Sequence, residues 1–295
     1  MPSPEHEQVV AMLTSRPRAE NPTLAEQRAG FEALAQMFPV ADDVIVQSLA
    51  VGSIDADWVS VPQSDPNRVV LYLHGGGYVI GSNTTHRELA SRIARAARAR
   101  VLVLDYRLAP EHPFPAAVDD ATAAFGWLLD QDVAPARIAI AGDSAGGGLT
   151  LATLLALKGA GVRLPACAVC LSPWTDLEGT GQSARPGAVD DPILTLEGLQ
   201  AMGRQYSAHD PQNPLAAPLY GDYAGIPPLL IQVGTRELLL DDAVRVADNA
   251  RRAGVDVTLE KEEGLIHVWQ LFGPQVPESA AAVERIGAFV RKHVA

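Results

Sequence analysis

One serine flanked by glycines constrains the fold of this chain more than any other feature. Residues 142–146 read Gly-Asp-Ser-Ala-Gly and join an apolar run at 138–141 to a helical segment at 149–158. At such a strand-to-helix turn the serine, Ser144, projects its hydroxyl into open space from a strained backbone. The glycines lack the Cβ atoms that would collide there, and the helix N-terminus favours negative charge. With 25 glycines in the chain, this pattern arises by chance in roughly one such sequence in ten, so the interpretation requires partners for Ser144.

The segments around Ser144 alternate between strand and helix. Apolar runs predict strands at 69–73, 101–104, 138–141, 166–171, 229–233 and 255–260. Helical patterns cover 87–99, 116–129, 149–158, 243–252 and 279–294. This alternation predicts an α/β fold with a mostly parallel central sheet, helices on both faces, and ligands at the carboxyl ends of the strands.

Three further segments precede this alternating region. Residues 21–38 carry an apolar stripe at helical spacing, which predicts an amphipathic helix that covers a core and stops at Pro39. Residues 44–51 and 54–61 are β-rich, and we expect both to be antiparallel edge strands.

A long insertion follows the strand at 166–171. More than fifty residues separate it from the strand at 229–233, where a handful would suffice. The insertion contains a predicted helix with Leu196, Leu199, Met202 and Tyr206 on one side. Because it leaves the carboxyl edge of the sheet, we expect it to arch over Ser144 and shape a substrate pocket. An additional packing helix is the alternative.

The charge of the chain narrows the classes of partner. Its 35 acidic and 23 basic residues give a formal charge of −12, which disfavours nucleic acid and anionic membrane surfaces and favours a neutral small molecule. No apolar run approaches the roughly 18 residues that a membrane span needs. The first residues also lack a basic region followed by an apolar one. These features indicate neither secretion nor a membrane span, and they predict a cytoplasmic protein.

The two cysteines, Cys167 and Cys170, have a spacing that invites a metal or redox interpretation. On an extended strand, however, they lie roughly 10 Å apart and face opposite ways, which exceeds the reach of a disulfide, about 7 Å. We therefore expect buried, inert thiols and no metal site.

A second glycine-rich stretch follows the strand at 69–73. Residues 74–77 read His-Gly-Gly-Gly, a pattern expected by chance in only about one such sequence in 250. Consecutive glycines let backbone amides turn toward a ligand, and with the amide of Ala145 they can hold the negative charge that acyl transfer builds on a carbonyl oxygen. A phosphate-binding loop is disfavoured, because neither Gly-Lys-Ser/Thr nor a spaced G-x-G-x-x-G follows.

Ser144 also needs a base and an acid. Of the seven histidines, His267 alone follows the last predicted strand at the carboxyl edge of the sheet, and we expect it to be the base. The acid should follow the strand at 229–233, since hydrolases of this kind run serine, acid, histidine along the chain. Glu237 lies in the turn off that strand, and we favour it over Asp241, which resembles the start of the next helix.

Taken together, these motifs resemble those of the bacterial hormone-sensitive lipase family of α/β-hydrolases. The resemblance spreads over nearly the whole chain. The matching segments are residues 74–77, 106–116, 142–146, 172–176 and 234–241. Two positions depart from the family pattern: the acid is more often Asp than Glu, and the histidine is commonly followed by Gly-Phe, where this chain has Val268 and Trp269.

The resemblance implies a role for each matching position. Ser144 would be the nucleophile, Glu237 the acid and His267 the base. The oxyanion donors would be the amides of Gly76, Gly77 and Ala145. It also implies N-terminal cap helices in residues 1–40, a catalytic α/β-hydrolase domain in 41–295, and a cap insertion at about 178–222.

The same resemblance implies a serine carboxylesterase that acts on short- to medium-chain acyl esters without a cofactor. A lactonase or amidase with the same three residues remains an alternative. A small-molecule receptor of this fold would be expected to lack one of the three, and none is missing. The strand at 255–260, if it lies at the edge of the sheet, could pair two subunits into a homodimer.

Overall fold

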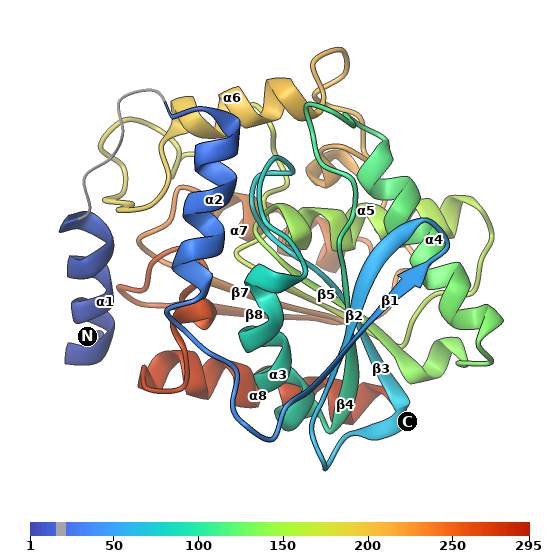
Figure 1. Cartoon of the computed structure of the whole chain (residues 1–295). Helices are drawn as coiled ribbons and strands as arrows, with labels where there is room; N and C mark the ends of the chain where they lie inside the picture. The colour runs from blue at the N-terminus through green and yellow to red at the C-terminus, as the bar shows by residue number, and fades with distance from the viewer. Residues whose placement is uncertain (16–21) are drawn as a thin grey trace.

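A computed structural model describes residues 1–15 and 22–295 (Figure 1). Within them, eight strands form one sheet in the order β1-β2-β4-β3-β5-β6-β7-β8. The strands are β1 (Ile45–Val51), β2 (Ile54–Ser60), β3 (Asp65–Leu73), β4 (Ala99–Leu104), β5 (Ile138–Asp143), β6 (Cys167–Leu171), β7 (Leu229–Gly234) and β8 (Val257–Glu262). The α-helices are α1 (Pro4–Ser15), α2 (Leu24–Ala35), α3 (Arg87–Ala97), α4 (Ala116–Asp130), α5 (Ala145–Gly159), α6 (Leu196–Tyr206), α7 (Leu240–Arg252) and α8 (Pro277–His293).

The sheet is parallel from β4 through β8 and antiparallel at one end. β1 pairs antiparallel with β2, and β2 pairs antiparallel with β4. The prediction of a mostly parallel sheet is confirmed, but the prediction that β2 is an edge strand is wrong, because β2 lies between β1 and β4. β8 forms the other edge, as expected for the strand at 255–260.

Helices cover both faces of the sheet. Leu71 of β3 packs in a core with α4, α5 and α7, whereas the adjacent Val70 packs in a separate core with α3 and α8. The two cysteines of β6 divide in the same way, since Cys170 belongs to the first core and Cys167 to the second. Both thiols are free and buried, as predicted. Burial raises their pKa, that of Cys167 to about 12.

In Figure 1, α1 lies at the left, α2 lies at the upper left, and α6 runs along the top. α2 begins at Leu24 behind a capping box, in which the Thr23 hydroxyl accepts a hydrogen bond from the Glu26 amide and the Glu26 carboxylate accepts one from the Thr23 amide. The predicted helix at 21–38 is therefore longer than the observed one, and residue 21 lies outside the described residues. Leu24 packs against the first core, but no residue of α2 is fully buried, so the stripe covers the core only in part.

Each helix of the described chain is too short or too polar to cross a bilayer.

Candidate active site

Ser144 occupies a tight turn between β5 and α5. Its backbone has φ 52° and ψ −120°, a conformation that costs about 1–3 kcal/mol and needs support from its surroundings. Support comes from hydrogen bonds: the Ser144 amide donates to the Leu171 carbonyl at 2.8 Å, and the Ser144 carbonyl accepts from the amides of Gly148 and Trp174. A Cβ atom on Gly146 would collide with the backbone carbonyl of Leu73. Only glycine therefore lets α5 approach β3 so closely.

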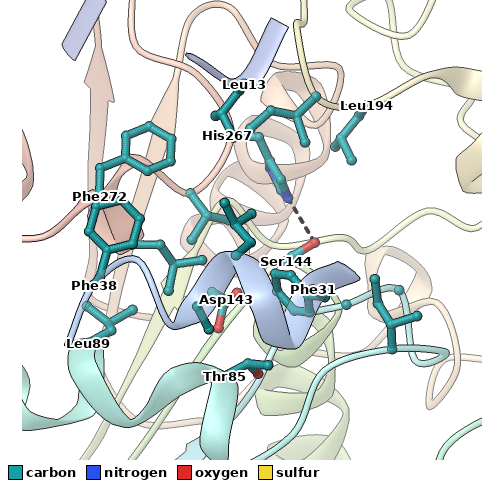
Figure 2. Close-up of a pocket in the computed structure, with 18 of the residues that line it drawn as sticks. Leu13, Phe31, Phe38, Thr85, Leu89, Asp143, Ser144, Leu194, His267 and Phe272 are labelled. Carbon is teal, nitrogen blue, oxygen red and sulfur yellow. Dashed lines mark hydrogen bonds between the residues drawn. The ribbon is translucent and has the colours of Figure 1, made fainter. Parts of the chain in front are cut away.

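Three side chains predicted from the sequence meet at this turn. His267 Nε2 lies 2.9 Å from Ser144 Oγ (Figure 2), and His267 Nδ1 lies 2.9 Å from Glu237 Oε2. A carboxylate accepts a hydrogen bond only from a protonated nitrogen, so Glu237 keeps the proton on Nδ1 and leaves Nε2 able to accept from the serine hydroxyl. All three side chains are buried, with Ser144 8% and His267 6% exposed at the floor of a cavity.

The carboxylate of Glu237 is held at its other oxygen. Oε1 accepts hydrogen bonds from the Ser172 hydroxyl at 2.8 Å and from the Gly234 amide at 2.5 Å. The Ser172 hydroxyl also accepts from the Val268 amide at 3.2 Å. One hydroxyl thus links the turn after β6 to the acid and to the loop that carries His267. In the sequence, Ser172 stands out only as part of the matching segment 172–176, and nothing there indicates that it binds Glu237.

The imidazole of His267 has a pKa above its ordinary value of 6.5. Burial alone would lower this pKa, because it disfavours the charged ring. The hydrogen bond to Glu237 and the negative charge of that carboxylate outweigh the effect of burial. The imidazole of His267, which faces the Ser144 hydroxyl, is therefore more basic than a free histidine.

Asp241, the alternative acid, does not approach His267. Its carboxylate accepts hydrogen bonds from the amides of Gln182 and Ser183 in the insertion. The neighbouring Asp242 likewise accepts from the amides of Thr175 and Asp176, each at 2.8 Å. Both aspartates at the start of α7 therefore hold loops, and only Glu237 contacts the histidine.

The glycine loop after β3 lies beside Ser144. Gly76 and Gly77 have φ of 118° and 63°, values that favour glycine. No residue within 1–15 and 22–295 accepts a hydrogen bond from the amides of Gly76, Gly77 or Ala145. Gly76 and Gly77 line the same cavity as Ser144. Unpaired amides at this position can stabilise an oxyanion.

Asp143 fastens the glycine loop to the serine turn. Its Oδ1 accepts hydrogen bonds from the Tyr72 hydroxyl at 2.7 Å and from the Gly75 amide at 3.1 Å, and His86 Nε2 lies 3.3 Å from Oδ2. Burial alone would raise the pKa of this carboxyl. The charge and hydrogen bond of His86 and the hydrogen bond of Tyr72 together outweigh burial, so the pKa lies below its ordinary value. Nothing in the local sequence around His86 showed that it faces Asp143.

His74, the first residue of the glycine loop, is a packing residue. Its ring stacks on Tyr106 with centroids 4.2 Å apart, and burial lowers its pKa to about 3. The Tyr106 hydroxyl donates to the His74 carbonyl at 2.7 Å. These contacts give Tyr106, in the matching segment 106–116, a structural role beneath the glycine loop.

The cavity above Ser144 has a volume of about 270 Å³ and mostly apolar walls (Figure 2). Its floor is formed at the carboxyl edge of the sheet, around Ser144 and His267. Its walls come from α1, α2, α3 and α6 and from the segments after α2, before α6 and after β8. They include Leu13, Phe31, Leu34, Phe38, Leu89, Leu194, Met202 and Phe272. The insertion therefore contributes to a pocket over Ser144, as predicted. The division of the chain at residue 40 stays a prediction.

Within the described residues, no group of three or more His, Cys, Asp and Glu side chains is arranged to hold a metal ion.

The family model and the similar proteins that match this chain all indicate a hydrolase. Residues 70–271 match a family model described as the alpha/beta hydrolase fold. An acetyl-hydrolase of Streptomyces hygroscopicus is 43% identical over 292 residues, which cover 99% of this chain and 97% of the relative. An esterase of Acinetobacter venetianus is 34% identical and covers 95% and 90% of the two chains.

Solved structures give the same result. The crystal structure of an esterase from the bacterial hormone-sensitive lipase family superposes with a TM-score of 0.97 at 48% identity, and the alignment covers the whole of both chains. An esterase/lipase from an uncultured bacterium gives a TM-score of 0.94 at 43% identity over 99% of each chain. The chain therefore has the α/β-hydrolase fold and belongs to the bacterial hormone-sensitive lipase family.

Proposed function

We propose that this protein is a serine carboxylesterase that hydrolyses short- to medium-chain acyl esters through an acyl-enzyme. The observation that carries this proposal is the chain of two 2.9 Å contacts from Ser144 Oγ to His267 and on to Glu237. The Ser144 end of this chain of contacts lies at an apolar cavity, beside three amides that lack acceptors in the described chain. The names of the relatives, esterase and acetyl-hydrolase, support the reaction class.

In the first half of the reaction, Ser144 Oγ attacks the ester carbonyl carbon while His267 Nε2 accepts the hydroxyl proton. The carbonyl oxygen gains negative charge, and the amides of Gly76, Gly77 and Ala145 donate hydrogen bonds to it. The C–O bond to the alcohol then breaks. His267 donates its proton to the departing oxygen, so a neutral alcohol leaves and the acyl group stays on Ser144.

In the second half, water takes the place of the serine hydroxyl. His267 accepts a proton from water as the water oxygen attacks the acyl carbon, and the same amides stabilise the second oxyanion. When the bond to Ser144 Oγ breaks, the serine recovers its proton from His267. The product is a carboxylic acid, and no redox or metal step is required.

The proposed substrate class follows from the walls of the cavity. Burial of one methylene group contributes about 0.8 kcal/mol, or a factor of about four in kcat/KM. Activity should therefore rise with acyl length until the roughly 270 Å³ cavity is filled. A related esterase, EstE5, was crystallised and soaked with p-nitrophenyl butyrate, a short-chain ester.

The test is a p-nitrophenyl ester series from acetate to laurate, with labelling by a fluorophosphonate probe. We expect an optimum at short to medium chains, and labelling that Ser144→Ala abolishes. An unlabelled wild-type protein would point instead to a silent receptor of this fold. A parallel series of lactones and amides with the same acyl group compares the alternatives that use the same three residues, and a higher kcat/KM for either would overturn the ester assignment.

A further inference from the structure

The last turns of α6 pack against the glycine loop and the residue that follows it. The ring of Tyr206 stacks on that of Tyr78, with centroids 3.7 Å apart and planes inclined by 2°. One turn earlier, Met202 lies so close to Gly77 that a Cβ on this glycine would collide with its sulfur. Met202 and Tyr206 lie four residues apart and so share one face of the helix. Both therefore face the segment that carries two of the proposed oxyanion donors.

Tyr78 follows Gly77 directly, so a displacement of Tyr78 is passed along the backbone to the peptide units of the glycine loop. Its φ is 62°, which a bulky residue adopts only where its surroundings hold it. Its carbonyl accepts a hydrogen bond from the Ala109 amide at 2.8 Å. The backbone of Tyr78 is thus fixed by one hydrogen bond and its side chain by packing. A change in the packing of the ring should change the direction of the Gly76 and Gly77 amides.

The ring of Tyr78 has aromatic neighbours from two other segments. Trp174 packs against it with centroids 6.0 Å apart, and the Trp174 amide donates to the Ser144 carbonyl at 2.9 Å. Tyr206 covers a face of the ring. Tyr206 is itself anchored, because its carbonyl accepts from the Phe114 amide at 2.7 Å. Tyr78 therefore lies between the serine turn and α6.

We infer that Tyr206 is a positioning residue for the oxyanion hole: its ring holds Tyr78, and through Tyr78 the amides of Gly76 and Gly77, in the geometry that the transition state requires. The inference rests on the proposed function of those amides. It gives the insertion a part in catalysis as well as in substrate binding. The same helix places Met202 in the wall of the cavity. A shift of α6 would therefore move both the cavity wall and the ring that packs on Tyr78, the residue next to the proposed oxyanion donors.

The test compares two substitutions at this position. Tyr206→Phe keeps the stacked ring and should retain kcat within about twofold. Tyr206→Leu keeps an apolar side chain but removes the flat surface against Tyr78. We expect its kcat on p-nitrophenyl butyrate to fall between about 10- and 100-fold, since small displacements of catalytic groups have effects of this size. KM should change by less than about twofold, because the lost interaction acts in the transition state.

A matched control separates positioning from general destabilisation. Tyr223 is also buried, lies outside the cavity lining, and donates a hydrogen bond to the Pro218 carbonyl. Tyr223→Leu should lower the melting temperature while kcat stays within about twofold of wild type. If Tyr223→Leu lowers kcat as much as Tyr206→Leu, or if Tyr206→Leu leaves kcat unchanged, the inference is wrong.

Two further measurements keep the result unambiguous. If Tyr206→Leu does not fold, Tyr206→Met is assayed in its place, with the same expected fall in kcat and the same overturning result. Fluorophosphonate labelling of wild-type Ser144 is measured in parallel. A labelled wild type with an unaffected Tyr206 variant would refute only the positioning role, whereas an unlabelled wild type would refute the proposed function.

Discussion

The two sides of the cavity are built by different interactions. On the sheet side, directional hydrogen bonds join Ser144, His267 and Glu237 in a row. On the side of α1, α2 and α6, the walls are apolar side chains such as Leu34 and Phe38, which contribute contact area. A directional hydrogen bond has one correct partner, whereas apolar contact can be redistributed among neighbours. Substitutions on the sheet side should therefore abolish catalysis, and substitutions in the wall should change substrate preference.

Ser144→Ala should have the largest effect. Removal of the hydroxyl eliminates the nucleophile, and loss of a serine nucleophile of this kind lowers kcat by at least about 10⁴-fold. The fold should persist, because the backbone hydrogen bonds of the turn do not involve the side chain. The measurement is kcat on p-nitrophenyl butyrate, with circular dichroism as the control for folding. Near-native activity would show that the reacting group lies elsewhere.

Glu237→Gln should rank next, with a loss of about 10³–10⁴-fold in kcat. Two donors, the Ser172 hydroxyl and the Gly234 amide, point at Oε1, so the amide oxygen of glutamine should occupy that position. Its NH₂ group would then face His267 Nδ1 and force the ring proton onto Nε2. In that tautomer the histidine cannot accept the serine proton.

Asp241→Asn is the matched control for this comparison. Its carboxylate binds the amides of Gln182 and Ser183 in the insertion, and asparagine retains one oxygen that can accept from them. We expect kcat to fall by no more than about fivefold. Equal losses in the two variants would mean that Glu237 is not the group that orients His267.

The pH dependence of kcat/KM should reflect the raised pKa of His267. Protonated His267 cannot accept the serine proton, so activity is lost as the pH falls through this pKa. Because the pKa lies above 6.5, the acidic limb should lie above pH 6.5, with a tenfold loss for each further pH unit below it. The same limb in a cavity-wall variant should be unchanged, since the shift arises from Glu237. An acidic limb below pH 6.5 would contradict the geometry of the pair.

Sequence alone predicted the residues that share one edge of the sheet, and physical reasons explain which features it missed. Ser144 and His267 follow predicted strands directly, and parallel topology brings the ends of those strands together. Glu237 and Asp241 both follow β7 within a few residues. Which of the two carboxylates faces His267 depends on the path of the turn before α7. The role of Ser172 depends on three distant segments that meet at one hydroxyl, which no local pattern encodes.

The wall was harder to predict than the sheet edge for a related reason. The apolar stripe of α2 has the spacing of a core-facing helix, and it was expected to cover a core. In the structure Leu24 packs against the core, whereas Phe31 and Leu34 are half-buried and line the cavity. A stripe that lines a substrate pocket and one that packs a core have the same periodicity. The burial of β2 between two strands was missed because its second partner, β4, lies more than forty residues away in sequence.

Phe38→Ala should have the smallest effect on chemistry and a selective effect on chain length. Phe38 lines the cavity, and Figure 2 shows it well apart from the Ser144 hydroxyl. Removal of its ring should leave room for additional methylene groups, each worth about a factor of four in kcat/KM when buried. The ratio of kcat/KM for p-nitrophenyl decanoate to that for the acetate should therefore rise at least about fourfold, while kcat on the acetate stays within about twofold of wild type.

The matched control is Val40→Ala, at an exposed position outside the lining, which should leave the ratio unchanged. If Phe38→Ala instead lowers kcat on acetate as strongly as a sheet-side variant, the wall is part of the catalytic machinery and the contrast between the two sides of the cavity is false.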